Sequence, residues 1–458
     1  MTDTNLPPKP KARAEKVSLR QYVKLFRKDI LSAQPARLYR AWMAEFRTPF
    51  FRFYLINQPE LVKMVLKTRP DVFPKSARVS EGLRPLLGEG VFLTNGETWK
   101  RQRRIIDPAF EGGRLRETFP AMWAASEAAV KRLEPFVDRE VEIEEHTSHA
   151  TADVIFRTLF SIPIENETAT EMFNEFKTYQ RSQPLLNLAA IFPLPRWMPR
   201  FFRSETRTSA FKIRALITQL TTLRTQQIAE ESAPDDLVTK IMLTEDPVSG
   251  ERFTTDEMVD QVSIFFLAGH ETSASALAWA LYLLAQFPEW QDKVAAEAEA
   301  GLANDFSAIS KLRISRDVFR EALRLYPPVP MMVRENTCPE EFRKRDVKVG
   351  SQIVLSAWHL HRHERLWDNP DGFDPARWGT ENGKTCMRDA YIPFSAGSRV
   401  CPGAGFATIE GVLVLSMILK NYRVSLTERP EPEPVAHLTV RAKNGIWLKI
   451  SPRTQNEK

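Results

Sequence analysis

One cysteine stands in a segment whose residues suit a metal ligand. The segment covers residues 394–403, FSAGSRVCPG, and places Cys401 directly before Pro402 and an apolar stretch over 404–420 that predicts a helix. At a helix N-terminus the dipole and free N–H groups favour a thiolate, and the two glycines let the backbone aim N–H groups at the sulfur. The segment predicts a metal-binding thiolate with Arg399 beside it as a cation for an anionic ligand group. Taken alone, a cysteine in this place is more often inert core or a reactive thiol.

A second segment places an acid and an alcohol inside an apolar stretch, residues 262–287. Ala268 and Gly269 remove side-chain bulk, so that a flat cofactor and a bound diatomic molecule can approach the backbone. Thr272 follows Ala268 by four residues, and its hydroxyl can compete for that carbonyl. Glu271 lies beside it, and an acid with an alcohol in a dry groove suits proton delivery. A helix crossing at small residues is the more ordinary explanation of so short a pattern.

Two pairs of side chains are spaced for contacts along predicted helices. Trp99 and Arg103 stand four residues apart, and an indole N–H with a guanidinium can bind carboxylates. Glu321 and Arg324 stand three residues apart, where a surface ion pair contributes about 0.2–0.5 kcal/mol. Apolar residues on the same face and a proline pair at the helix end favour a buried pair instead.

Together these segments resemble the motifs of the cytochrome P-450 family, in the family's order and over residues 51–450. The segment with the cysteine resembles the family's heme-binding loop, in which the cysteine is the axial thiolate of the heme iron. The residues that carry this match are Phe394, Gly397, Arg399, Cys401 and Gly403. The stretch from Ala268 to Ser273 resembles the oxygen-activation motif.

The resemblance also implies roles for residues that bind or support the heme. Trp99 and Arg103 match a pattern that binds a heme propionate, and Arg334 matches a further propionate-binding position. A stretch before the cysteine loop, PDGFDPARW, contains an arginine that would complete a buried network. The residues of this structural network are Glu321, Arg324 and Arg377.

The fold implied by the resemblance is mainly α with a small β subdomain, a triangular helical prism. Heme b would lie between the long distal helix and the proximal cysteine loop, with O2 as co-substrate. The reaction implied is insertion of one oxygen atom into a lipophilic substrate, by C–H hydroxylation or epoxidation, with protons passed through Thr272 and Glu271. Two alternatives stay open, a peroxide-using peroxygenase and a non-catalytic heme-thiolate sensor or carrier, although neither makes use of the acid and alcohol.

The elements that must position these residues are mostly helices. Apolar residues recur at helical spacing over 99–106, 122–133, 211–230, 254–287 and 315–325. Thr254 and Glu257 predict a capping box at the start of the long helix, and Pro288 marks its end. Strands are predicted over 51–56 and 347–357 and, as a hairpin, over 438–440 and 445–450. We predict a flexible tail over 1–20, one domain over 21–450 and a C-terminal tail over 451–458.

Composition fits a folded protein of a reducing compartment. The 458 residues are 43% apolar and 27% charged, with three cysteines and no apolar leader in the first twenty residues. These features predict a cytoplasmic, monomeric, soluble bacterial-type protein without a transmembrane anchor, since residues 262–287 have a charged centre and read as a core helix. The charge of +6 is spread over the chain, which argues against nucleic-acid binding.

No flavin or iron–sulfur segment is evident, since three cysteines cannot supply four cluster thiolates and a heme ligand. Electrons would therefore come from an acidic ferredoxin or flavodoxin with its NAD(P)H reductase. A candidate docking site for this partner is formed by Lys100, Arg101 and Arg104. The alternative is that these residues form an ordinary solvated helix face.

Other candidates are weaker. His359, His361 and His363 alternate, and on one strand they would suit zinc or non-heme iron, but charged residues stand among them. Residues 192–202 are expected to pack in the core, line the substrate entrance or touch a membrane. Segments expected to flank the substrate are largely apolar, namely 80–93, 183–192, 264–268, 329–333 and 438–446.

Overall fold

The long apolar segment forms the central helix of the protein. In the computed structural model, which describes residues 6–47, 52–182, 204–436 and 438–453, this helix is α12, Thr255–Gln286. Thr254 and Glu257 form the predicted capping box, and Pro288 opens the next helix, so both predicted ends are confirmed. The helix packs against α7, α10, α14 and α17 and is buried over most of its length.

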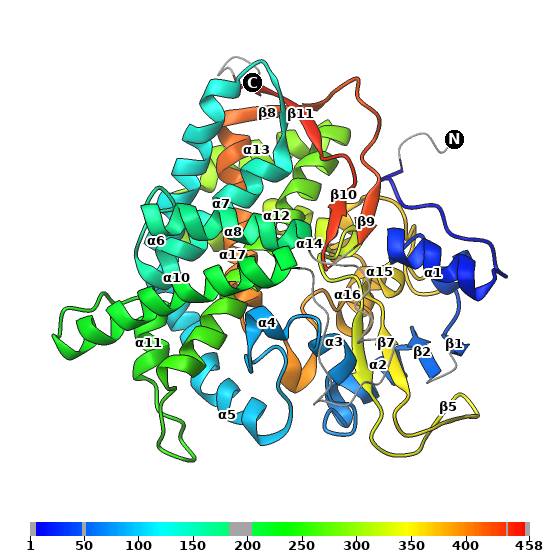
Figure 1. The fold of residues 1–458 in the computed structure, drawn as a ribbon. Coiled ribbons are helices and arrows are strands. Elements are labelled where there is room, and N and C mark those ends of the chain that lie inside the picture. Colours follow the sequence, from blue (N-terminus) through cyan, green and yellow to red (C-terminus); the bar gives the residue numbers. More distant parts are fainter. Residues whose placement is uncertain (1–5, 48–51, 183–203, 437, 454–458) are drawn as a thin grey trace.

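Helices dominate the described residues, as predicted. Figure 1 shows the long helices α6, α7, α8, α10 and α12 on one side of the molecule, and the sheet of β1, β2 and β7 on the other side next to α1, α2 and α15. The helices are α1 Leu19–Lys28, α2 Pro59–Lys63, α3 Ala77–Ser80, α4 Arg84–Leu87, α5 Gly96–Ile106, α6 Gly112–Leu133, α7 Ile143–Phe160, α8 Glu167–Ser182, α10 Ser204–Ala229, α11 Leu237–Leu243, α12 Thr255–Gln286, α13 Pro288–Gly301, α14 Arg313–Leu325, α15 Ala357–Leu360, α16 Glu381–Asp389 and α17 Ala404–Asn421.

The strands of the described residues form four small sheets. The largest has the order β1-β2-β7-β4, in which β2 and β7 are parallel and the other neighbours antiparallel. The strands are β1 Met43–Arg47, β2 Arg52–Ile56, β3 Glu140–Glu142, β4 Met332–Glu335, β5 Glu340–Phe342, β6 Arg345–Val347, β7 Gln352–Leu355, β8 Tyr422–Leu426, β9 Pro434–Ala436, β10 Val440–Ala442 and β11 Trp447–Pro452.

The predicted C-terminal hairpin is wrong. β10 pairs with β9, whereas β11 lies between β3 and β8 in another sheet. Leu448 and Ile450 of β11 are fully buried, and their alternation needs a sheet on the core. The turn before β11 therefore passes the chain from one sheet to another instead of closing a hairpin.

Part of the segment predicted as a flexible tail contacts the core. The Tyr326 hydroxyl donates to the Pro8 carbonyl at 2.8 Å, and the Arg13 N–H donates to the Gln34 carbonyl at 3.1 Å. The domain limits stay a prediction. Among the described residues, α17 alone is long and apolar enough to span a membrane, and 67% of it is buried inside the protein. The predictions for residues 183–192 and 192–202 lie outside the described residues.

Candidate active site

Cys401 lies directly before α17, where the sequence places it. Its N–H donates to the Phe394 carbonyl at 2.9 Å, which closes the loop in front of the helix. At Gly397 φ is 70°, and a Cβ there would lie 2.1 Å from the carbonyl oxygen of Leu66. Glycine is therefore required for the loop to pass this close to another backbone segment.

The Cys401 side chain is surrounded by protein and is still accessible, from which we infer a hollow beside the thiol. Burial raises the pKa of the thiol, while the Gly403 N–H and the charge of Arg103 act in the opposite direction. The residue nevertheless keeps accessible surface. Both observations hold for a side chain that is surrounded by protein and lines an internal space. Arg103 also donates to the Val400 carbonyl at 2.8 Å, which ties α5 to the cysteine loop.

A second accessible patch interrupts the burial of α12. Between residues 261 and 284, only Ala268, Gly269 and Thr272 are accessible, and they share one turn. The Thr272 hydroxyl donates to the Ala268 carbonyl at 2.5 Å, as predicted. Gly269 also fits the helix crossing given as the ordinary explanation, because a Cβ there would lie 2.5 Å from Ile155 of α7. That glycine admits a neighbouring helix.

Two contacts bring this patch beside the first turns of α17. Phe110 packs edge-on against Phe265 of α12 and Phe406 of α17, with ring centroids 5.7 and 6.4 Å apart. Further along, the Ser273 hydroxyl of α12 donates to the Glu410 carboxylate of α17 at 2.6 Å. Since the accessible residues of α12 lie between these contacts, they share the region where α17 begins.

Three cations lie around the Trp99 ring close to the cysteine loop, and a fourth lies beside them. The distances to the indole ring are 4.8 Å for Arg399, 5.6 Å for Lys75 and 5.8 Å for Arg103. Arg334 joins them from β4, which forms a bridge with Lys75. The predicted residues Trp99, Arg103, Arg334 and Arg399 are thus brought together by α5, β4 and the loop before α17.

This cluster lacks matching negative charge. Burial and then the charges of three arginines lower the pKa of Lys75 to about 6, and burial with Arg399 lowers that of Arg334 to about 10. In the described part of the chain, the single ion pair of these four cations joins Arg103 and Asp107 at 2.6 Å. Buried cations are costly unless an anion accompanies them. An accessible thiol beside such a cluster fits heme, which carries iron and two carboxylates.

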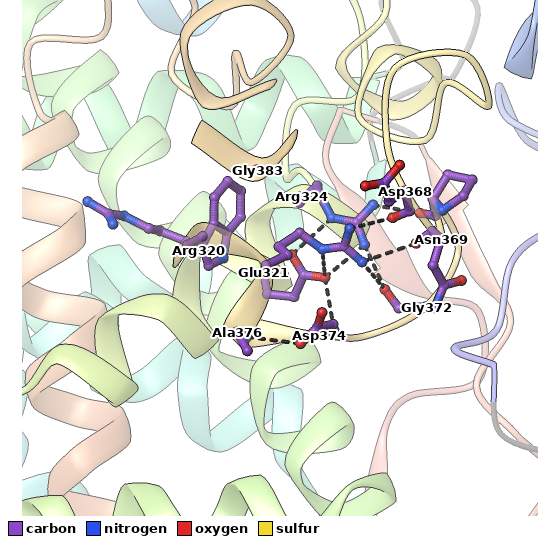
Figure 2. A network of polar contacts seen from close by, with 12 residues as sticks. Arg320, Glu321, Arg324, Asp368, Asn369, Gly372, Asp374, Ala376 and Gly383 are labelled. Atoms are coloured by element: carbon purple, nitrogen blue, oxygen red, sulfur yellow. Dashed lines mark hydrogen bonds and ion pairs between the residues drawn. The ribbon is translucent and has the colours of Figure 1, made fainter. Parts of the chain in front are cut away.

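A buried network holds the chain before the cysteine loop (Figure 2). Glu321 accepts from Arg324 Nε and Nη2 at 2.9 and 2.8 Å and from Arg377 Nε at 2.8 Å. All three side chains are buried, which confirms the predicted contacts. The other guanidinium N–H groups donate to the carbonyls of His361, Asp368, Asn369, Pro370 and Gly372. Full pairing offsets the desolvation of the three charges.

Glu271 belongs to a different set of contacts from Thr272. Its carboxylate accepts from the Thr439 hydroxyl at 2.6 Å and the Gln180 amide at 3.0 Å, and it pairs with Arg441 at 3.1 Å. Among the described residues, it makes no hydrogen bond to Thr272. Its role in proton delivery stays a prediction.

The three basic residues predicted as a dock each meet a carboxylate. Lys100 pairs with Glu97, Arg101 with Glu257 and Arg104 with Asp246. The face therefore offers less net charge than the sequence indicates.

The three histidines do not form a metal site within the described residues. They lie in and after α15 rather than on one face of a strand. His359 is hydrogen bonded to Ser356, His361 accepts from the Ile392 N–H, and His363 stacks on Trp42.

Three polar residues of this region were missed from the sequence. Lys75 belongs to the cation cluster, Asn95 lies beside it, and Glu410 is a fully buried carboxyl between α12 and α17. No short motif marks Lys75 or Asn95, whereas an acid within the apolar stretch 404–420 was a usable signal for Glu410.

Comparisons with known proteins agree with this geometry. The family model described as Cytochrome P450 matches residues 42–450. Cyclooctat-9-en-7-ol 5-monooxygenase of Streptomyces melanosporofaciens is 32% identical over 398 residues, 85% of this chain and 83% of the relative. Cytokinin hydroxylase of Arabidopsis thaliana is 28% identical over 411 residues, 87% of this chain and 78% of the relative. The crystal structure of the cytochrome P450DA heme domain matches with a TM-score of 0.82 at 23% identity, over 99% of both chains, which supports the fold.

Proposed function

This chain belongs to the cytochrome P450 family and is a monooxygenase of that family, and on this premise we propose how its own residues serve the reaction. Cys401 binds the iron of heme b from the hollow before α17. Trp99, Arg103, Arg334 and Arg399 hold the heme carboxylates. The observation that carries this assignment is the group of buried cations with so little matching acid beside an accessible thiol. The heme, when bound, supplies the activation of O2 and the transfer of one oxygen atom.

The residues of α12 position substrate and protons. The accessible turn at Ala268, Gly269 and Thr272 would face the substrate, and the Thr272 hydroxyl would hold a proton there. Glu271 exchanges protons with solvent water that reaches it beside Arg441, whose side chain is 41% exposed.

The substrate we propose is lipophilic and is hydroxylated at a C–H bond or epoxidised. Phe265 contacts Phe110 beside the accessible turn, and Met331 and Met332 are half-buried at the start of β4. Such a lining favours apolar compounds and gives little hydrogen-bond selection. Cyclooctat-9-en-7-ol, the compound in the name of the Streptomyces relative, is one compound to screen.

Electrons come, in this proposal, from a separate acidic ferredoxin or flavodoxin in the cytoplasm. The support is the formal charge of +6. A turnover rate that falls as salt is added supports an acidic partner, and a rate insensitive to salt argues against it.

The test is a screen of lipophilic compounds for a substrate-induced spin shift, followed by turnover. Product formed with O2 and a reductase system supports the monooxygenase proposal. Product formed with peroxide alone would identify a peroxygenase, and binding without product would identify a sensor or carrier.

A further inference from the structure

Asn95 precedes α5, yet its side chain does not cap that helix. Its Oδ1 instead accepts from the Lys75 backbone N–H at 2.9 Å and from Arg399 Nη1 at 2.8 Å. Its amide nitrogen donates to the Lys75 carbonyl at 3.1 Å. A single neutral side chain therefore joins the segment of Lys75, the start of α5 and the cysteine loop.

The contact with Asn95 uses only one nitrogen of the Arg399 guanidinium. Asn95 takes one Nη1 hydrogen, while the Nε of Arg399 is buried and has no hydrogen-bond partner among the described residues. A buried guanidinium N–H without a partner is costly, so the remaining edge of Arg399 is suited to an anionic group. Arg334 and Arg399 lie close enough to Lys75 to help lower its pKa, and Arg399 does the same to Arg334.

The neutral charge of Asn95 is the second part of the argument. An aspartate would accept the same two hydrogen bonds, but it would lose the donation to the Lys75 carbonyl and would form an ion pair with Arg399. That pair would weaken the attraction of the cluster for carboxylates. An amide fixes the geometry and leaves the positive charge in place.

We propose that Asn95 is a positioning residue for heme binding, which orients Arg399 and the backbone of Lys75 as one unit and leaves the positive charge of Arg399 available to the heme carboxylates. The inference rests on the proposed function, because it requires heme in the hollow beside Cys401. A residue that supports a group at a metal site typically changes affinity by about 10- to 100-fold when it is replaced.

The test uses the heme-loaded full chain and the variants Asn95→Ala and Asn95→Asp. The measurements are the rate of heme transfer to an excess of heme-free myoglobin, the reduction potential and the melting temperature. The control is Thr380→Ala, which removes the side chain that caps α16 through the Gly383 N–H at 3.0 Å.

We expect Asn95→Ala to release heme about tenfold faster. Asn95→Asp, which keeps the shape, should also release heme faster and should shift the potential to more negative values, because its charge favours the ferric state. In an Arg399→Gln background, Asn95→Ala should add little, since both changes then remove the same interaction.

Three outcomes decide the matter. The inference is overturned if both variants release heme at the wild-type rate and keep the wild-type potential. This holds even if their melting temperature falls as much as that of the control Thr380→Ala. If the effects of Asn95→Ala and Arg399→Gln on heme release simply add, the positioning role through Arg399 is overturned. A wild-type chain that binds no heme would overturn the proposed function itself.

Discussion

The hydroxyl of Thr272 lies 2.5 Å from the carbonyl oxygen of Ala268, one turn earlier in α12. This carbonyl already accepts the backbone N–H of Thr272 in a regular helix, so the hydroxyl competes for it. Both residues belong to the one accessible turn of an otherwise buried stretch. The hydroxyl can therefore turn from the helix toward a molecule in the hollow without crossing packed side chains.

Thr272→Ala should uncouple electron consumption from product formation. Without the hydroxyl, proton delivery is disturbed, and we expect the ratio of product to peroxide to fall about tenfold or more. The measurement is product and hydrogen peroxide per NAD(P)H consumed. Thr218→Ala removes the same kind of hydroxyl-to-carbonyl bond from the exposed face of α10 and should leave the ratio unchanged. Equal coupling in Thr272→Ala and wild type would argue against the relay.

Replacing Glu321 should destabilise the protein strongly. Glu321→Gln leaves two buried guanidinium groups without their common carboxylate, at a cost of about 3–5 kcal/mol in the free energy of unfolding. Denaturant unfolding followed by circular dichroism measures this loss. The control Glu381→Gln breaks an exposed pair with Lys384 and should leave the midpoint in place. A midpoint for Glu321→Gln equal to that of the control would contradict the structural role.

Glu410→Gln should stabilise the protein at alkaline pH. Burial raises the pKa of Glu410 to about 8, against about 4.5 for an ordinary glutamate. Between these values the folded state keeps a proton that the unfolded state has lost, so this carboxyl makes the protein less stable as the pH rises. Glutamine does not titrate, so Glu410→Gln avoids this decrease in the free energy of unfolding, which amounts to a few kcal/mol by pH 8. Melting curves between pH 5 and 9 measure it, and parallel pH profiles for variant and wild type would contradict the assignment.

Heme binding should take up a proton through Lys75. The heme-free pKa of about 6 leaves this lysine neutral at pH 7–8, whereas heme carboxylates favour its charged form. Titration calorimetry in buffers of different ionisation enthalpy measures the uptake. Lys75→Met should abolish it, and the exposed Lys100→Met should not. Unchanged uptake in Lys75→Met would assign the proton to another group.

The sequence was most informative where chemistry restricts residue types locally. Cys401 before Pro402, the capping box at Thr254 and the spacing of Ala268 and Thr272 all depend on backbone neighbours within one turn. The structure confirms the helix start at Thr254 and the contact of Thr272.

Contacts between distant segments carried weaker signals. Asn95 meets Arg399 across 304 residues of sequence, and neither spacing nor composition marks that contact. The prediction of a C-terminal hairpin failed for the same reason. β11 pairs with β3 and β8 and not with β10, its neighbour in sequence. The positive charge of Lys100 can be seen in the sequence. Its ion pair with Glu97 makes this lysine less available to an acidic partner protein.

The most direct test is the spectrum of the reduced carbonyl complex of Cys401→Ser. The wild type should show the strongly red-shifted Soret band of a thiolate-bound heme iron, and Cys401→Ser should lose it. Cys386→Ser, which removes a buried thiol 3.1 Å from the Leu366 carbonyl, should keep the band. A red-shifted band retained in Cys401→Ser would contradict the assignment of this sulfur as the ligand.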